Sequence, residues 1–256
     1  MDQSLQYIRD RDKTIINRRN LFRNKNLLLW YENLYREQFK GIDTIEKKRI
    51  LEIGSGTSPL KHYYKNVITT DILDMDHLDY KLDFEKIDKF EAVEDCSVDI
   101  ITMTDVLHHV RDPITCLEKA RCKLKESGMV IASEPYFSCL SSLVYKFHYE
   151  PSIFDISEPI INTEKGPFSG GNMAVPFLIF FRKKSWLDRL ERYYSFSRDE
   201  VIYFSSLSYM MTGGISRRFP VNHSLYRWLL DLDIGLAKKM PKIFSSFFIV
   251  RLHKKA

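Results

Sequence analysis

The stretch ILEIGSGTSPL, residues 50–60, joins a short apolar run to a glycine-rich turn. Residues 50–53 have the apolar, β-branched composition of a buried strand, and Gly54 and Gly56 follow directly. Without side chains, such glycines let a ligand approach the backbone and the start of the next helix. The dinucleotide-binding fingerprint has a third glycine, whereas Ser58 and Pro59 follow the second glycine here. The turn therefore predicts a nucleotide-like ligand at a strand-to-helix junction.

Strand-like runs and helical segments alternate on both sides of this turn. Three further runs read as strands, at residues 67–70, 98–104 and 129–133. Between the last two, Asp112 and Pro113 supply the N-cap and first residue of a helix. Its apolar face is Ile114, Leu117, Ala120 and Leu124, and it is expected to end at Gly128. This alternation predicts βαβ units, and therefore an α/β fold whose parallel sheet carries helices on both faces.

Polar residues lie at the carboxyl ends of the predicted strands, which is where open parallel sheets bind ligands. Glu52 precedes the first glycine, Asp71 follows the second strand, and Thr104 and Glu134 end later strands. The carboxylate of Glu52 would repel a pyrophosphate but attract the ammonium and sulfonium groups of S-adenosylmethionine. Asp71 is placed to accept hydrogen bonds from both ribose hydroxyls, as the acid of the dinucleotide fold does.

The combined motifs resemble those of the class I S-adenosylmethionine-dependent methyltransferases of the type 11-like group. The motifs are ExGxG at residues 52–56, Asp71, Asp83-Phe84, DIITMTDVLHHVRDP at 99–113 and GMVIASEP at 128–135. The resemblance covers about residues 48–135. It implies a Rossmann-like, seven-stranded, mostly parallel sheet with an antiparallel final hairpin. The sixth and seventh strands would then lie near residues 196–204 and 244–252.

The resemblance also implies a set of cofactor-binding residues at the strand ends. They are Glu52, reaching the methionine end through water; Gly54, Ser55 and Gly56, beneath the cofactor; Asp71, at the ribose, with Ile72 beside it; Asp83 and Phe84, at the adenine; and Thr104, near the sulfonium.

Two residues are candidates for catalysis. His108 follows a predicted strand end, where an imidazole can accept a proton from an acceptor hydroxyl, and Glu134 could orient that histidine or bind the acceptor. The alternative readings are a packed or capping histidine and a solvated loop acid. No base is strictly required, because methyl transfer is an in-line displacement that positioning alone can accelerate. No metal site is predicted, since the four cysteines lack zinc-type spacing and are expected to be reduced and mostly buried.

The remaining chain is read as parts of one methyltransferase domain spanning residues 1–256. Residues 1–45 form an N-terminal helical layer, with one helix expected from about 4 to 39, and residues 46–135 form the cofactor-binding half. The aromatic-rich segment 136–180 predicts a cap over the acceptor, and 181–256 supplies helices and the final hairpin. Helices are expected at residues 182–193 and 225–239.

Composition and charge narrow the classes of protein. Hydrophobic residues make up 44% and charged residues 29% of the 256, which is ordinary globular composition. No apolar run approaches a membrane span and the N-terminus has no secretory signal, so a cytoplasmic location is the expectation. Residues 1–135 carry 22 Lys and Arg against 24 Asp and Glu, whereas residues 136–256 carry 17 against 10. Nucleic acid is disfavoured as a substrate, because no base-amine motif or RNA-binding module is recognisable.

The C-terminal half, more loosely, resembles methyltransferases of bacterial glycan-assembly clusters, which implies a sugar or lipid-linked saccharide acceptor. The sequence therefore predicts S-adenosylmethionine-dependent O-methylation of a small polar acceptor, with a role in polysaccharide biosynthesis. Basic pairs at 182–184, 217–218 and 238–239 could meet phosphates or lipid headgroups, although solvated helix faces are the alternative. Two other functions stay open: a catalytically silent binding module of the same fold, and an NAD(P)-dependent reductase, against which Glu52 argues.

Overall fold

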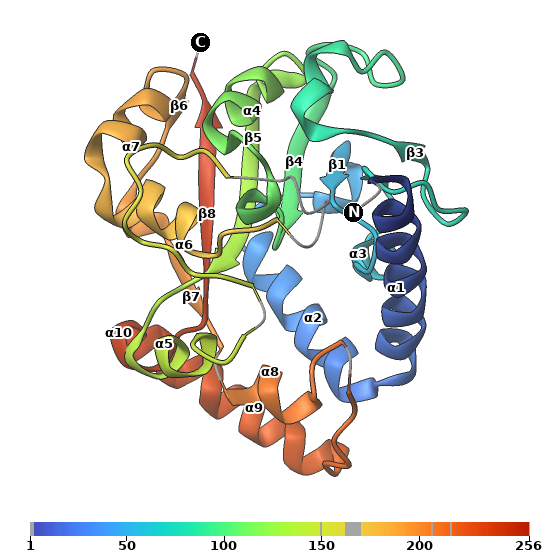
Figure 1. Cartoon of the computed structure of the whole chain (residues 1–256), viewed down its shortest axis with the longest axis vertical. Helices are drawn as coiled ribbons and strands as arrows, with labels where there is room; N and C mark the ends of the chain where they lie inside the picture. The colour runs from blue at the N-terminus through green and yellow to red at the C-terminus, as the bar shows by residue number, and fades with distance from the viewer. Residues whose placement is uncertain (1–2, 149, 162–169, 206, 216, 256) are drawn as a thin grey trace.

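A computed structural model describes residues 3–148, 150–161, 170–205, 207–215 and 217–255. Its centre is one eight-stranded sheet with the order β3-β2-β1-β4-β5-β8-β6, in which β7 also pairs with β8 (Figure 1). The strands are β1 (Ile50–Ile53), β2 (Val67–Asp71), β3 (Tyr80–Lys81), β4 (Val98–Thr104), β5 (Leu124–Pro135), β6 (Tyr194–Ser195), β7 (Ile202–Phe204) and β8 (Phe247–Lys254). The first five run parallel, and β8 runs antiparallel to β5, β6 and β7.

Helices and short helical turns surround the sheet on both faces (Figure 1). The α-helices are α1 (Gln3–Arg23), α2 (Lys25–Gln38), α3 (Leu60–Tyr63), α4 (Pro113–Ala120), α5 (Cys139–Tyr145), α6 (Ala174–Phe177), α7 (Lys184–Glu191), α8 (Leu207–Thr212), α9 (His223–Lys239) and α10 (Pro241–Phe244). Short segments of other helix types are η1 (Ile45–Lys47), η2 (Phe84–Lys89), η3 (Leu107–His109), η4 (Leu178–Arg182) and η5 (Arg198–Glu200).

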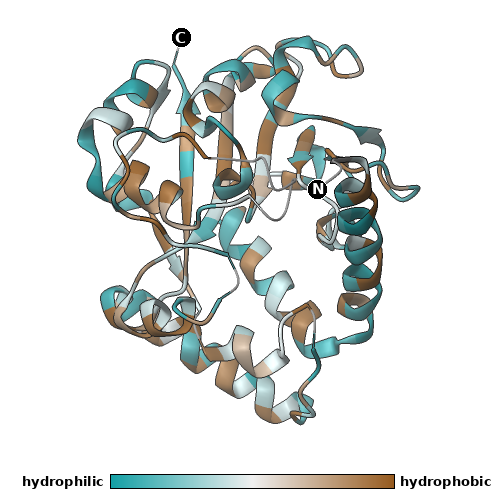
Figure 2. Ribbon diagram, viewed as in Figure 1, coloured by the Kyte–Doolittle hydropathy of each residue, from teal (hydrophilic) through white to brown (hydrophobic). Residues whose placement is uncertain are grey.

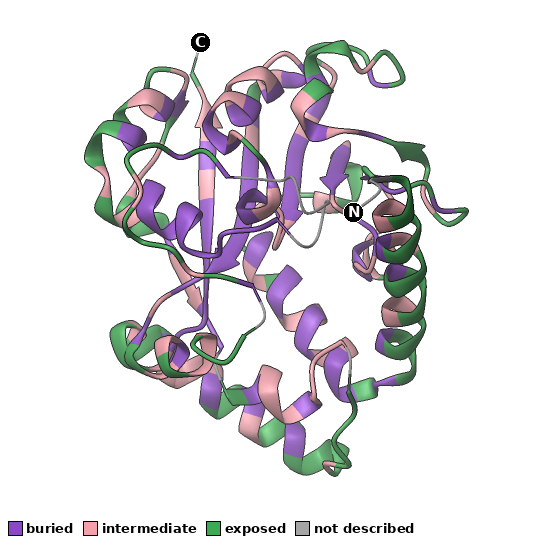
Figure 3. Ribbon diagram, in the orientation of Figure 1, coloured by how far each residue is buried: buried purple, intermediate pink, exposed green. Residues whose placement is uncertain are grey.

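Alternation along the central strands divides the core into two layers. Leu51, Ile101 and Val130 point to the layer that packs against α4, α6 and α7. Their neighbours Ile50 and Ile100 point to the opposite layer, with α2 and α9. Successive side chains of a strand face opposite sides of a sheet, so strands buried on both faces are apolar throughout. Figure 3 shows this burial on the strands and on the inner sides of the covering helices.

The predicted fold class is confirmed, and β1 and β4 lie where the sequence placed them. The sheet has eight strands rather than seven, because the turn η5 divides the expected sixth strand into β6 and β7. The last strand begins at Phe247, whereas Phe244 ends α10. The helices expected at 182–193 and 225–239 are α7 and α9, with shifted ends.

Two helix predictions are wrong in their boundaries. The N-terminal helix is interrupted at Asn24, whose side chain accepts a hydrogen bond from Leu27 N (3.3 Å) and caps α2. The helix that begins at Pro113 ends at Ala120, and Leu124 already belongs to β5, where it pairs with Val98. The strand therefore begins four residues before Gly128, which the sequence suggested as a helix stop, through pairing with β4 alone, and β8 joins it only from Met129 onward.

The helix α1 runs beside α3 (Figure 1), and the rings of Phe22 on α1 and His62 on α3 lie 5.8 Å apart. Among its described side chains, only Asp10, Thr14 and Leu21 are buried. The cysteines also differ from expectation. All four are free thiols, but only Cys116 is buried, whereas Cys96 and Cys139 are exposed.

Candidate active site

A cavity of about 1270 Å³ lies at the carboxyl ends of the parallel strands. Three groups of elements enclose it: the strand ends themselves, the helix α1, and a cap made of α5, α8 and the segments that follow them. Its size exceeds the few hundred to about 1,000 Å³ typical of a pocket for one small molecule. The cavity therefore has room for a nucleoside-sized cofactor together with a second small ligand.

The glycine turn forms one wall of this cavity. Gly54 has a φ of +75°, and a Cβ atom there would overlap the side chain of Val106. A Cβ atom on Gly56 would lie 2.8 Å from Thr14 Cγ2 and 2.9 Å from Asp71 Oδ2. Both glycines line the cavity. The turn thus needs glycine for its backbone conformation at Gly54 and for close packing at both positions.

Glu52 and Ser55 lie behind the turn, because neither lines the cavity. The buried carboxylate of Glu52 accepts hydrogen bonds from Ser55 Oγ (2.7 Å) and Ser58 Oγ (2.5 Å). Burial raises the pKa of Glu52 to about 7, although the two serines and the guanidinium of Arg18 lower it. Arg18 also donates to Ser58 O (2.5 Å) and so joins α1 to the turn. Water-mediated contact between Glu52 and the cofactor stays a prediction.

Asp71 lines the cavity at the end of β2, but its oxygens already accept hydrogen bonds from the backbone. Oδ2 accepts from Gly56 N and Oδ1 from Leu73 N, each at 2.9 Å. Burial raises the pKa of Asp71, which these hydrogen bonds partly offset. Each carboxylate oxygen can accept a second hydrogen bond, so a ribose hydroxyl can still bind. Ile72 also lines the cavity.

The predicted adenine and sulfonium contacts also line the cavity. Asp83 and Phe84 lie at the start of η2, where Asp83 accepts from Glu85 N (3.1 Å) and pairs with Lys86 (3.0 Å). Thr104 ends β4, and its hydroxyl accepts from Gln38 Nε2 (3.0 Å), which also donates to Ser133 Oγ (2.6 Å). The buried Gln38 thus fixes Thr104 from α2. Nothing in the sequence of α2 distinguishes Gln38 from any other residue at the edge of the core.

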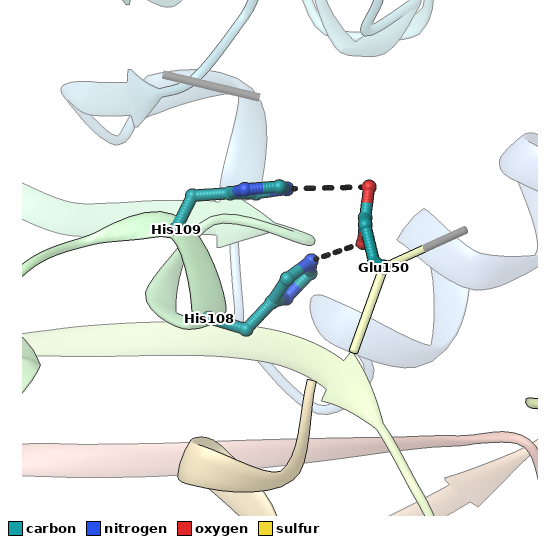
Figure 4. A group of neighbouring side chains, drawn as sticks. All are labelled: His108, His109 and Glu150. Carbon is teal, nitrogen blue, oxygen red and sulfur yellow. Dashed lines mark ion pairs between the residues drawn. The ribbon is translucent and has the colours of Figure 1, made fainter. Parts of the chain in front are cut away.

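His108 lies between two carboxylates. Its Nδ1 is 2.7 Å from Glu134 Oε2 and its Nε2 is 3.3 Å from Glu150 Oε2. Figure 4 shows Glu150 facing both His108 and His109, with 3.8 Å between His109 Nε2 and Glu150 Oε1. Glu134 is fully buried, does not line the cavity, and accepts from Val106 N and Leu107 N. Glu134 therefore contacts His108 from behind and does not reach the cavity itself.

These contacts set the protonation of the cluster. Burial alone lowers the pKa of His108, but Glu134 and Glu150 raise it well above its usual value. Burial, followed by the charge of His108, lowers the pKa of His109 to about 3. Asp105, which lines the cavity, has a pKa raised to about 7 by burial, despite the opposing effect of His108. At neutral pH the cluster therefore holds a charged His108 beside a neutral His109.

Asp105 and Glu150 are the acids of this cluster to which the sequence assigned no role. Asp105 has a φ of +56°, a conformation that non-glycine residues rarely adopt and that often marks a functional site. Glu150 comes from the cap, where Met173 N donates to Pro151 O (3.0 Å) and Asn172 N donates to His108 O (2.8 Å). His108 and Glu150 are 42 positions apart and Glu150 lies in an irregular segment, so their pairing leaves no periodic signal in the sequence.

Histidine and glutamate are also ligands of transition metals. The nearest ligand atoms of His108, His109 and Glu150 lie within 4.8 Å of one another, as do those of Asp105, His108 and Glu134. A metal requires a deprotonated imidazole nitrogen, whereas the two carboxylates stabilise the proton on His108. A proton on Nε2 of His108 and a metal at that nitrogen therefore exclude each other.

Comparison with known proteins agrees with this geometry. A family model described as a methyltransferase domain matches residues 22–208. An S-adenosylmethionine-dependent methyltransferase from Archaeoglobus fulgidus has a similar structure, with a TM-score of 0.50, 15% identity, and coverage of 91% of this chain and 96% of that one. A second, from Thermotoga maritima, has a TM-score of 0.49, 17% identity, and coverage of 94% and 99%. No curated protein sequence matches the chain significantly.

The fold is thus that of a Rossmann-like, S-adenosylmethionine-dependent methyltransferase. The chain belongs to the methyltransferase-domain family, since the model covers well over half of it. S-adenosylmethionine is the expected cofactor, and the residues present fit it. The glycine turn brings the backbone to the cavity, acidic side chains lie at successive strand ends, and the volume accommodates a nucleoside with an amino-acid tail.

Proposed function

We propose that this protein transfers the methyl group of S-adenosylmethionine to a hydroxyl of a small polar acceptor, a sugar or lipid-linked saccharide. One observation carries the proposal: the glycine turn and the proton-handling cluster of His108 and Asp105 face the same cavity. A cofactor that lies over Gly54 and Gly56 would place its sulfur near Thr104. The neighbouring Asp105 and His108 then border the remaining volume, where an acceptor fits.

The cofactor half of the site supplies binding and orientation. S-adenosylmethionine, when bound, supplies a methyl group that its positively charged sulfur already activates. Asp71 accepts from the ribose, Asp83 and Phe84 hold the adenine, and Glu52 contributes negative charge from behind the turn. Since opposite charges attract strongly where water is partly excluded, these acids favour a cationic ligand over a diphosphate.

Proton removal is assigned to Asp105. It lines the cavity with a pKa of about 7, close to the value that best serves a general base near neutral pH. His108 is already protonated between its two carboxylates, so its role is to hold Glu150 in place and to balance the charge of Asp105. Glu134 acts through His108. The catalytic pair that the sequence suggested therefore becomes a positioning pair beside Asp105.

The acceptor half is lined by aromatic and basic side chains of the cap. Tyr145, Tyr209 and Phe219 line the cavity together with Arg217. Aromatic faces pack against the apolar faces of sugar rings, and an arginine forms paired hydrogen bonds with a phosphate. This lining supports a glycan acceptor that carries phosphate.

Binding and transfer are tested separately. S-adenosylhomocysteine should raise the unfolding temperature, whereas NADH should not. At a hundredfold excess of ligand over Kd, the expected gain in the free energy of unfolding is about 2.7 kcal/mol. Asp71→Asn preserves the size of the side chain and should remove most of this shift. Stabilisation by NADH in its place would overturn the cofactor assignment.

Transfer is measured with tritiated S-adenosylmethionine and saccharide pools. Asp105→Asn should lower kcat by about 10²-fold or more while leaving the binding of S-adenosylhomocysteine intact. Asp99→Asn is the matched control, because Asp99 lies at the other end of β4, where it accepts from Arg49 N. Cofactor binding without transfer to any saccharide pool would instead support the silent binding module.

A further inference from the structure

The helix α9 has two apolar faces, and one of them is exposed. Its inner face, with Tyr226, Leu230 and Ala237, packs toward α2. Leu225, Trp228 and Leu232 fall within an arc of about 60° on another side of the helix, given about 100° per residue. Their exposed fractions are 52%, 62% and 47%. A helix that only covers a core has no need for this second apolar stripe.

Two neighbouring helices carry further exposed apolar side chains. The helix α10 packs against both α9 and α5. Tyr145 on α5 donates to Ser246 O (2.6 Å) and Ser245 donates to Ala237 O (3.1 Å), which ties the three helices to the start of β8. We call the exposed large apolar side chains on and directly beside these three helices the docking face: Leu143, Phe147, Leu225, Trp228, Leu232, Met240 and Ile243. Figures 2 and 3 show hydrophobic and exposed turns along α5, α9 and α10.

Basic side chains surround the docking face. Residues 207–244 contain six Lys and Arg against two Asp, and of the two acids Asp233 is buried. The exposed basic residues are Arg217, Arg218, Arg227, Lys238, Lys239 and Lys242, with Lys146 directly after α5. An apolar surface flanked by basic residues is typical of helices that lie in the interface of an anionic membrane. Residues 207–244 therefore carry a net charge of +4 beside the apolar patch.

We infer that the docking face binds the surface of a bilayer that contains anionic phospholipids. Among the described helices none is long and apolar enough to cross a bilayer, so the contact is peripheral. Phe147 and Phe219 both line the cavity and are exposed, at 86% and 48%, so the cavity reaches the surface beside the docking face. If the acceptor is lipid-linked, as the proposed function holds, this orientation brings it to the cavity directly from the membrane.

Only some of the basic pairs in the sequence belong to this surface. Arg217-Arg218 and Lys238-Lys239 flank the docking face, whereas Arg182 and Lys183 lie by α7, on a separate part of the molecule (Figure 1). There they stack over aromatic rings, Arg182 over Phe177 and Lys183 over Trp186. The structure thus separates two sets of charges that the sequence could not distinguish.

Tryptophan fluorescence of the whole chain tests the contact directly. Of the three tryptophans, Trp30 and Trp186 are 1% and 6% exposed, so a change on binding vesicles reports Trp228. Vesicles of phosphatidylcholine with phosphatidylglycerol should shift the emission to shorter wavelength, and brominated lipids should quench it. Phosphatidylcholine alone should do neither, and added salt should weaken binding.

Co-sedimentation of variants with the same vesicles distinguishes binding through the docking face from nonspecific hydrophobic adsorption. Trp228→Ser should lower partitioning about tenfold. Lys239→Ala together with Lys242→Ala should lower it roughly fivefold per lysine. Ile16→Ser is the matched control, because Ile16 is a 55% exposed apolar residue flanked by basic residues on α1, away from the docking face. Its partitioning should equal that of the unmodified chain.

Three outcomes would overturn the inference: no shift or sedimentation with anionic vesicles, an equal loss in Ile16→Ser and Trp228→Ser, or a dimer that Trp228→Ser converts to a monomer. The last would show that a second copy covers the face. Binding of S-adenosylhomocysteine, measured on the same variants, is expected to be unchanged. If the unmodified chain does not bind S-adenosylhomocysteine, that result counts against the proposed function but not against the membrane contact.

Discussion

Replacing Gly54 by alanine tests the physical basis of the cofactor turn. The new Cβ atom would meet two separate penalties. A φ of +75° costs a residue with a side chain about 1–2 kcal/mol, and the overlap with Val106 adds about 1–3 kcal/mol, as overpacking in protein interiors does. We therefore expect Gly54→Ala to lower the free energy of unfolding by about 2–5 kcal/mol.

A second glycine separates the two penalties. Gly41 has nearly the same φ, +76°, but nothing lies within 4 Å of the position its Cβ would occupy. Gly41→Ala should therefore cost only the conformational part, about 1–2 kcal/mol. The difference between the two variants measures the packing penalty alone.

A double-mutant cycle in urea completes the test. In a Val106→Ala background the overlap is removed, so Gly54→Ala should cost about as much as Gly41→Ala. If Gly54→Ala is no more destabilising than Gly41→Ala, or if its cost is the same with valine or alanine at position 106, the packing argument is refuted. Gly54→Ala with valine at position 106 should also bind S-adenosylhomocysteine more weakly, because the new Cβ atom would displace Val106 into the cavity.

Three further predictions follow from individual residues. Because Glu52 has a raised pKa of about 7, its negative charge is lost as the pH falls through 7; calorimetry should show weaker binding of S-adenosylmethionine below pH 7, and Glu52→Gln should reduce that dependence to what Asp71 and Asp105 contribute. Removing one of the two carboxylates beside His108, by Glu150→Gln, should lower the pKa of His108 in an NMR titration, and an unchanged pKa would mean that Glu150 does not contact it. Gly235 lies inside α9, and the position of its missing Cβ is open space. Because alanine loses less conformational entropy in a helix than glycine, Gly235→Ala should raise the free energy of unfolding, measured by thermal unfolding, by about 0.5–1 kcal/mol.

The sequence predicted the parts of the fold that local composition decides. The run of apolar residues in β1 is buried throughout and ends in two glycines, so both ends of that strand are marked in the chain. Leu124 was assigned to the wrong element because pairing with Val98, more than twenty residues away, overrides its place in a helical pattern. Asn24 likewise ends α1 through its cap and its hydrogen bond to Thr212 O (3.0 Å), a contact across most of the chain.

The site shows the same division. Gly54, Asp71 and Thr104 were found because a strand end is visible in sequence and all carboxyl ends of parallel strands meet at one edge. The partner of His108 at β5, Glu134, was found for that reason too. Glu150, Arg18 and Gln38 were missed because they reach the site from the cap, α1 and α2, and only tertiary packing decides which side chain of an amphipathic helix meets the sheet.

The weak attachment of α1 bears on how the glycine turn is uncovered. Thr14 of α1 closes over Gly56, yet the helix buries only three of its described side chains, and Asn24 divides it from α2. Segments with so few buried contacts open at a small fraction of the global unfolding free energy. We therefore expect α1 to open about Asn24 more readily than the sheet unfolds, which would uncover the glycine turn at Gly56.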